Sequence, residues 1–289
     1  RRSHSSMASH LTTPLTILLV TTVLGPWLSE CTNFTIVNHC KETVWPGITP
    51  SENISSKDYS ALKPGETTVF AAPPGWHGRI WGRTGCSFDN SGNGTCQTGS
   101  CGSALKCSGP GQQPATIAEF TLGDPNFYDV SLVGGFNLPM VVEPLNGKGN
   151  CSTAGCDSDL RNNCPSELAI KDNGKTIACQ SACDVFKTDE YCCRGNYGNA
   201  ASCKPTNYST TFKKSCPAAY SYAFDDMTSL ITCSSVSDYI VTFCASRNQT
   251  TCIYHGQELV CNSFGLSLST DTLSNVWRIL TLILLSMIG

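Results

Sequence analysis

Glu119 and Asp129 are two carboxylates whose spacing could bring them together, either for acid–base chemistry or for binding hydroxyl groups. Residues 116–122 alternate apolar and polar side chains, residues 123–126 are turn formers, and residues 127–133 are β-branched and aromatic. If the two predicted strands pair as a hairpin, both acids can lie on one face of the sheet, because side chains alternate across it. The plainer interpretation is a pair of solvated carboxylates at a strand edge.

The composition indicates a disulfide-bonded domain. The chain has 289 residues, 19 of them cysteine, and a formal net charge of −3. Cysteine at this frequency is typical of proteins that fold in an oxidising compartment, and the length also allows a sizeable core. The mildly acidic balance argues against nucleic acid or an anionic membrane surface as a partner. Only five histidines are present and none stands beside a Cys-x-x-Cys motif, so we expect neither a metal site nor a cofactor.

Residues 1–31 read as a short upstream stretch followed by a signal peptide. Residues 15–28 have the length of a secretory apolar region, although no Lys or Arg lies between Met7 and that region. Cleavage after Cys31 leaves small residues before the cut and 18 cysteines, an even number, after it.

The other end of the chain has the pattern of a lipid-anchor signal. Residues 277–289 are apolar except for Arg278 and are too few to span a bilayer. A polar spacer at residues 267–275 and small residues before it complete the pattern of a glycosylphosphatidylinositol attachment site, with Ser263 as the predicted attachment point. The alternatives are a C-terminal amphipathic helix and a vacuolar-type propeptide.

The first half of the chain predicts strands. Residues 32–44 read as a pair of strands around a turn at Asn38 and His39, and further short strands follow, separated by turn residues. No long period of 3.6 residues occurs before about residue 155, which favours a β-sandwich. Residues 86–107 hold four cysteines among Gly, Ser and Asn, and we expect a small lobe of loops held by local bridges.

The second half predicts a lobe of loops and short helices before the chain returns to strands. Helical turns are expected at residues 184–191 and 206–214, and strands at residues 219–224 and 239–244. The adjacent Cys192 and Cys193 should bond to different partners, because vicinal cysteines have poor geometry for pairing with each other.

Several motifs together resemble the thaumatin-like proteins, the pathogenesis-related family 5. They are Ile-Val-Asn-His-Cys at 36–40, Trp-Gly-Arg-Thr-Gly-Cys at 81–86, Gly-Asn-Gly-Thr-Cys-Gln-Thr-Gly-Ser-Cys at 92–101, Gly-Phe-Asn-Leu-Pro-Met at 135–140, Glu-Tyr-Cys-Cys at 190–193 and Val-Thr-Phe-Cys at 241–244. Ser100 departs from the Asp of the family pattern. The resemblance covers residues 32–244 and implies a mainly β fold, a thaumatin-like β-sandwich with a disulfide-rich loop/helix lobe and a small loop lobe.

The resemblance also implies the domain boundaries. The sandwich comprises residues 32–85, 108–155 and 217–244, the small loop lobe residues 86–107, and the disulfide-rich lobe residues 156–216. A C-terminal extension at 245–263 and the attachment propeptide at 264–289 follow.

The resemblance implies eight disulfides, a connectivity that spacing alone leaves open. They are Cys40–Cys244, Cys86–Cys96, Cys101–Cys107, Cys151–Cys233, Cys156–Cys216, Cys164–Cys179, Cys183–Cys192 and Cys193–Cys203. Cys252 and Cys261 lie outside the family core and are expected to form a ninth pair.

In this family a cleft between the sandwich and the disulfide-rich lobe is lined by one Arg, one Glu and three Asp. The resemblance places Arg79, Glu119, Asp129 and Asp225 in that cleft, whereas the remaining Asp falls on Gly134. Such carboxylates can accept hydrogen bonds from a glycan, or they can hydrolyse it if one is a general acid and the other a base or nucleophile.

For hydrolysis, crowding by Asp129 would favour the protonated form of Glu119. Glu119 is therefore the predicted acid and Asp129 the predicted base or nucleophile, while Arg79 would hold one carboxylate ionised or grip the sugar. The loss of an Asp at Gly134 lowers the negative potential of the cleft and favours binding over hydrolysis. We expect at most weak endo-β-1,3-glucanase activity.

The predicted function is that of a plant defence protein, antifungal and monomeric, that binds β-1,3-glucan of a cell wall. It would be secreted and extracellular, and tethered to the outer face of the plasma membrane only through the lipid anchor. The alternative is a non-catalytic cell-wall or surface protein, or an inhibitor of foreign hydrolases, on the same scaffold.

Sequons for glycosylation stand at Asn33, Asn53, Asn93, Asn207 and Asn248. Trp45, Trp76 and Trp81 could stack on sugars, but tryptophan in a sandwich is more often part of the core.

Overall fold

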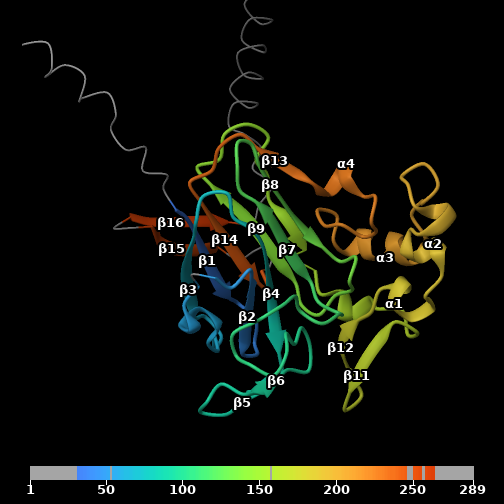
Figure 1. Ribbon diagram of the computed structural model, residues 1–289, viewed down its shortest axis with the longest axis horizontal. Helices are drawn as coiled ribbons and strands as arrows, with labels where there is room; N and C mark the ends of the chain where they lie inside the picture. Colours follow the sequence, from blue (N-terminus) through green and yellow to red (C-terminus); the bar gives the residue numbers. More distant parts are fainter. Residues whose placement is uncertain (1–30, 53, 157, 246–249, 256–257, 264–289) are drawn as a thin grey trace, which may run out of the picture.

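Two five-stranded sheets face each other in the computed structural model, which describes residues 31–52, 54–156, 158–245, 250–255 and 258–263 (Figure 1). The first sheet has the order β10-β9-β14-β1-β3, with β1 (Thr32–Asn38), β3 (Thr67–Ala72), β9 (Met140–Leu145), β10 (Ala154–Cys156) and β14 (Asp238–Phe243). The second has the order β13-β8-β7-β4-β2, with β2 (Val44–Thr49), β4 (His77–Thr84), β7 (Ile117–Thr121), β8 (Asn126–Ser131) and β13 (Ile231–Cys233). The mainly β fold expected from the sequence is confirmed.

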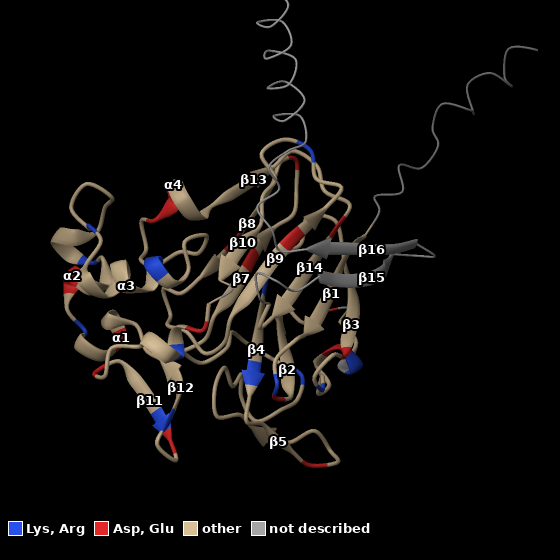
Figure 2. Cartoon of the chain, turned by 180° about the vertical axis from the view of Figure 1, so that it is seen from behind, with Lys and Arg blue, Asp and Glu red and all other residues tan. Residues whose placement is uncertain are grey.

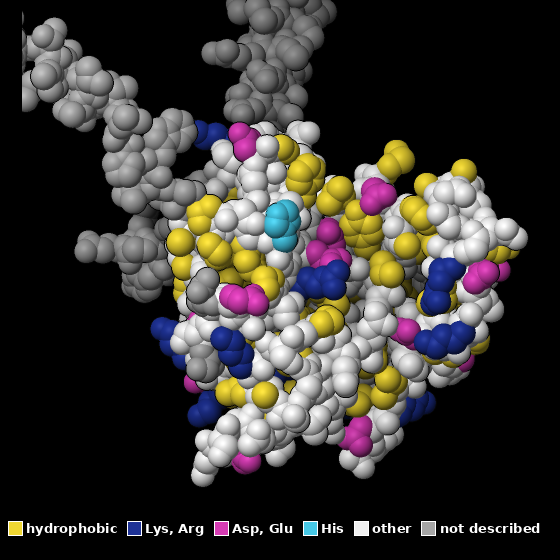
Figure 3. Space-filling view, viewed as in Figure 1, with side chains coloured by type: hydrophobic (Ala, Val, Ile, Leu, Met, Phe, Trp, Pro, Cys, Tyr) yellow, Lys and Arg dark blue, Asp and Glu magenta, His cyan; other side chains and the backbone are white. Residues whose placement is uncertain are grey.

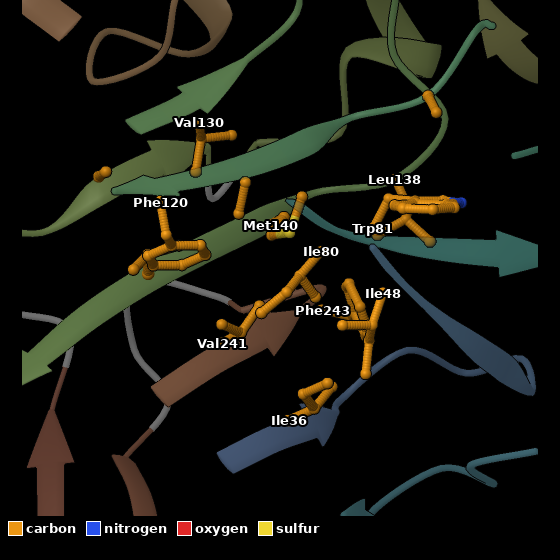
Figure 4. Packing of buried hydrophobic residues seen from close by; sticks show 14 of the residues in the cluster. Ile36, Ile48, Ile80, Trp81, Phe120, Val130, Leu138, Met140, Val241 and Phe243 are labelled. Atoms are coloured by element: carbon orange, nitrogen blue, oxygen red, sulfur yellow. The ribbon is translucent and has the colours of Figure 1, made fainter. Parts of the chain in front are cut away.

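The core lies between the two sheets because each strand turns alternate side chains inward. Figure 4 shows side chains of both sheets meeting there, among them Ile36 and Val241 from the first and Ile80 and Phe120 from the second. At one end of the core six aromatic rings pack with centroids 4.8 to 6.4 Å apart: Phe34, Phe70, Trp76, Phe120, Tyr128 and Tyr239. Trp76 and Trp81 are buried and belong to this core, and Trp45 is half-buried.

The expected strand pair at residues 32–44 does not form. β1 lies between β14 and β3 in the first sheet, so both of its edges are already paired, and β2 pairs with β4 in the second sheet. The buried Asn38 side chain stabilises the connection by which the chain passes from β1 in the first sheet to β2 in the second. Its nitrogen donates to the carbonyls of Glu42 (2.9 Å) and Leu62 (2.7 Å), and its oxygen accepts from the Cys40 amide (2.8 Å).

Two lobes project from the sandwich. The small loop lobe contains β5 (Ser87–Phe88) and β6 (Gly94–Thr95). The disulfide-rich lobe lies on one side of the sandwich in Figure 1 and contains short helices and one hairpin. Its elements are η2 (Leu160–Asn163), β11 (Ala169–Asp172), β12 (Lys175–Cys179), α1 (Ala182–Phe186), α2 (Asp189–Cys192), η3 (Gly195–Tyr197) and α3 (Asn207–Ser215). One further short helix, η1 (Ser56–Tyr59), packs near β2 and β3.

The eight disulfides implied by the resemblance are present in the structure: Cys40–Cys244, Cys86–Cys96, Cys101–Cys107, Cys151–Cys233, Cys156–Cys216, Cys164–Cys179, Cys183–Cys192 and Cys193–Cys203. In the C-terminal extension, β15 (Thr250–His255) pairs with β16 (Glu258–Ser263), and the register sets Cys252 opposite Cys261. The ninth bond stays a prediction.

The strand expected at residues 219–224 is absent. Tyr220 makes only an isolated bridge with Ser131 beside β8, and the chain then turns into α4 (Asp226–Ser229). The free edge of β8 is taken by β13 instead, so residues 219–224 have no neighbouring strand with which to pair further.

The signal peptide and the attachment propeptide lie outside the described residues and stay predictions, and Ser263 is the last residue of β16. Within the described part of the chain, none of the helices has the length and apolar character needed to cross a bilayer.

Candidate functional site

Three ionisable side chains form a row across neighbouring strands of the second sheet. The register places Arg79 of β4 opposite Glu119 of β7, and Glu119 opposite Asp129 of β8. Their chain neighbours Ile80 and Phe120 are buried in the core, so the three ionisable side chains point away from it. The hairpin expected around the two acids is thus present, and both acids lie on one face.

Arg79 and Glu119 form an ion pair. Arg79 Nε donates to Glu119 Oε1 at 2.6 Å, and the two side chains are 49% and 35% exposed. A pair this open to solvent contributes little to stability, typically below about 1 kcal/mol. Its effect here is on geometry, because it fixes the two side chains next to each other on the lining of one groove.

Asp129 is the more enclosed acid. The pKa of its carboxyl is raised to about 8, mainly by burial and further by the charge of Glu119, while Arg79 opposes the shift. Its Oδ1 is buried and meets no hydrogen-bond partner among the described residues. A carboxyl in this environment is protonated at neutral pH.

This environment reverses the expected roles of the two acids. Glu119 was expected to be the proton donor, but it is the carboxylate paired with a guanidinium. Asp129 is the group whose protonated form is favoured. The physical reason is burial. Mutual repulsion favours one protonated acid without selecting which, and the burial of Asp129 selects Asp129.

The row forms the floor of an open groove of about 420 Å³, the acidic groove, whose walls include His77, Phe127 and Leu230. Figure 3 shows acidic and basic side chains together in the hollow between the sandwich and the disulfide-rich lobe. Elsewhere Lys and Arg are scattered over loops and lobes (Figure 2). The described residues contain no cluster of three His, Cys, Asp or Glu arranged to hold a metal ion.

Asp225 is not part of the row. Its Oδ2 accepts from the Ser221 amide (3.0 Å) and hydroxyl (2.9 Å) and pairs with Lys213 Nζ (2.9 Å), and its Oδ1 accepts from the Thr228 hydroxyl (2.8 Å). Burial alone would raise the pKa of Asp225, but the hydrogen bonds from Lys213, Ser221 and Thr228 outweigh it and lower the pKa. Both oxygens are therefore engaged inside the protein, and contact of Asp225 with a ligand stays a prediction.

Asp226, the chain neighbour of Asp225, was missed by sequence reasoning and is the more exposed of the two aspartates. It accepts a hydrogen bond from the Tyr220 hydroxyl at 2.7 Å, and its charge helps to raise the pKa of Asp129. The adjacent Asp-Asp dipeptide was the signal that two residues, and not one, could serve this position.

We expect Asp225→Asn to lower the free energy of unfolding by about 1–3 kcal/mol, because the ion pair with Lys213 is lost and the half-buried Ser221 donors lose an ionised acceptor. Asp226→Asn should change it by less than about 0.5 kcal/mol, since that side chain is exposed. Urea unfolding of both variants checks this. Equal losses would contradict the distinction between them.

Gly134 lies away from the row, beside a second cavity of about 230 Å³ between the sandwich and the disulfide-rich lobe. The residues that line it include Gln113, Val133, Asp184 and Tyr222.

The sequon residues Asn33, Asn93 and Asn207 are exposed, and Asn53 and Asn248 lie outside the described residues.

The comparisons with known proteins identify the family of this chain. The family model described as "Thaumatin family" matches residues 38–245. "Pathogenesis-related thaumatin-like protein 3.5" of Cryptomeria japonica is 49% identical over 235 residues, which cover 80% of this chain and 98% of that protein. "Pathogenesis-related protein 5" of Arabidopsis thaliana is 49% identical over 217 residues, covering 74% and 90%.

Among solved structures, the thaumatin-like xylanase inhibitor TLXI matches with a TM-score of 0.41 and 26% identity, covering 73% of this chain and 99% of that one. The family match, the identity to whole curated relatives and the eight observed disulfides lead to one conclusion: this chain belongs to the thaumatin family.

Proposed function

We propose that this protein is an extracellular defence protein whose acidic groove binds β-1,3-glucan of a cell wall. The observation that carries the proposal is the row Arg79–Glu119–Asp129, which presents an ionised carboxylate, a guanidinium and a protonated carboxyl side by side on the floor of an open groove. Such a row offers both acceptors and donors to sugar hydroxyls.

Two further observations support an extracellular location and a role in defence. Eight disulfides are typical of proteins that fold and work in an oxidising, extracellular compartment. Relatives that share about half of the sequence are named pathogenesis-related proteins, which supports a role in defence.

Hydrolysis is the second activity that the row supports. A protonated Asp129 can donate a proton to a glycosidic oxygen, and the ionised Glu119 can activate water or stabilise positive charge on the sugar. Because Arg79 already occupies one oxygen of Glu119, that carboxylate is less free to activate water, and we propose that any endo-β-1,3-glucanase activity is weak.

Glu119→Gln is expected to weaken retention on immobilised β-1,3-glucan about tenfold or more. Removing a charged acceptor costs roughly 1.5–3 kcal/mol per hydrogen bond, and 1.4 kcal/mol is a factor of ten in affinity. The measurement is a pull-down on insoluble glucan over a range of protein concentrations.

Asp124→Asn is the matched control, because Asp124 is an exposed acid on the turn of the same hairpin. Unchanged retention of Glu119→Gln would point to the alternative, a surface protein or hydrolase inhibitor that does not use the groove for glucan. Release of reducing sugar from laminarin by the wild type, and its loss in Asp129→Asn, would separate hydrolysis from binding alone.

A further inference from the structure

The sandwich and the disulfide-rich lobe are joined by a narrow seam next to Gly134. Phe136 and Cys179 exchange two backbone hydrogen bonds across it, at 2.8 and 2.7 Å. Gly135 has a left-handed backbone with φ +95°, and a Cβ there would lie 2.7 Å from the Cys179 carbonyl and 2.6 Å from Pro114. The chain at residues 113–114 is therefore packed directly against this seam.

Gln113 extends the seam with its side chain. Oriented so that both ends of the amide meet partners of opposite polarity, its nitrogen donates to Asp184 Oδ2 at 2.6 Å and to Oδ1 at 3.2 Å. Asp184 lies in α1 and is held there by the Ser181 hydroxyl (3.0 Å) and by Lys187 Nζ (3.2 Å). The amide thus connects the start of the β7 segment to the first helix of the other lobe.

Gly134 provides the space for this contact. A Cβ at position 134 would lie 2.6 Å from the end of the Gln113 amide and 2.9 Å from its Cδ. Gly134 does not have the left-handed backbone of its neighbour Gly135, so a side chain at position 134 conflicts only with the movable end of the Gln113 side chain and would displace it from Asp184.

We propose that Gln113 is a positioning residue that ties the sandwich to α1 through Asp184, and that it uses the space that an acidic side chain at position 134 would need. An aspartate at 134 would displace the amide and add a second carboxylate near Asp184. With glycine at 134 and glutamine at 113, neither position adds a charge beside Asp184. The cavity between the sandwich and the disulfide-rich lobe is therefore lined here by an uncharged amide that is hydrogen-bonded to α1.

An exchange of the two functional groups tests the contact. Gln113→Glu sets two carboxylates against each other, whereas Gln113→Glu combined with Asp184→Asn restores an amide facing a carboxylate with the same net charge. We expect amide hydrogen exchange at Val185 and Lys187, whose N–H groups close α1, to accelerate at least tenfold in Gln113→Glu. The double variant should return to within about threefold of the wild type.

The single variant Lys187→Ala measures what the loss of the Lys187 pair contributes on its own. A double variant that exchanges as fast as Gln113→Glu would overturn the proposal, and so would a Gln113→Glu variant that exchanges at the wild-type rate. Neither outcome depends on glucan.

A substitution at position 134 provides a second, independent test of the proposal. Gly134→Asp should lower the thermal midpoint of the wild type by several degrees, and the same substitution in Gln113→Ala should lower it by much less, because the space is then free. Equal losses in the two backgrounds would contradict the steric link.

A third measurement rests on the proposed function. Gln113→Glu should retain less glucan than the wild type, and the double variant should recover that retention. Absence of retention by the wild type would reject the proposed function, and the exchange data would still decide the role of Gln113.

Discussion

Replacing Cys40 and Cys244 by alanine is expected to lower the free energy of unfolding by about 5 kcal/mol. β1 and β14 run parallel in the middle of the first sheet, with Asn38 opposite Phe243, so the two cysteines follow the strand ends at the same edge. The bridge joins residues 204 positions apart. In the chain-entropy picture a loop of that length removes about 5 kcal/mol of freedom from the unfolded chain.

The matched control is the double alanine variant of Cys86 and Cys96, which are 10 positions apart and staple the small loop lobe. The same relation predicts a loss of about 3 kcal/mol there. Guanidinium unfolding at neutral pH measures both. Equal losses for the two bridges would show that strain or residual structure in the unfolded chain, and not loop length, determines their contributions.

The position of the acids in one row could be predicted because it depends on a local hairpin. Residues 117–131 hold two strands of clear pattern and a turn, and a hairpin register brings Glu119 opposite Asp129 with no distant information. Residues 32–44 have an equally clear pattern but were wrongly expected to pair. β1 pairs instead with β14, about two hundred residues later, and single-segment patterns carry no signal for such a contact.

The protonation of the row could not be predicted for a similar reason. Leu230, from a segment about a hundred residues further along the chain, lines the same groove as Asp129, and the charge of Asp226 from that segment helps to raise the pKa of Asp129. Motif matching with the family also treated Asp225 as a free carboxylate. Its partners Lys213, Ser221 and Thr228 become visible only when α3 and α4 are placed beside each other.

Gly134 shows the same limit at a single position. The sequence indicates that an expected Asp is missing, and the simplest interpretation is a loss of negative charge. The structure adds that Gln113 occupies the adjoining space and bonds to Asp184. Positions 113, 134 and 184 lie far apart in sequence, so their interdependence follows from packing and not from any motif.

Asp129→Asn is expected to make the protein more stable at pH 8, by roughly 1–3 kcal/mol. The pKa of Asp129 is raised from an ordinary 3.8 to about 8, so between those values the folded protein holds a proton that the unfolded chain releases. Stability from this group is therefore fully present below about pH 4 and is lost as the pH rises toward 8. The whole shift corresponds to roughly 5–6 kcal/mol, and the open groove screens part of it.

The comparison of variant with wild type across pH 4–8.5 isolates this effect, because other raised groups such as Glu143, whose pKa is about 7, are common to both. The variant should match the wild type near pH 4 and exceed it increasingly as the pH rises from about 4 to 8. Asp225→Asn should behave in the opposite way. The lowered pKa of Asp225 adds stability above about pH 4, so its removal costs most at neutral pH and least in acid.

Opposite pH profiles for the two aspartates would establish that Asp129 is kept protonated in the groove while Asp225 is kept ionised by its partners outside it. That separation of charge states is what hydrolysis of a glycan requires of a proton donor, and a protonated donor also serves simple binding. If Asp129→Asn were less stable than the wild type at pH 8, Asp129 would be an ordinary ionised acid. The groove would then hold two negative carboxylates beside Arg79, and the proposed proton donor would be lost with it.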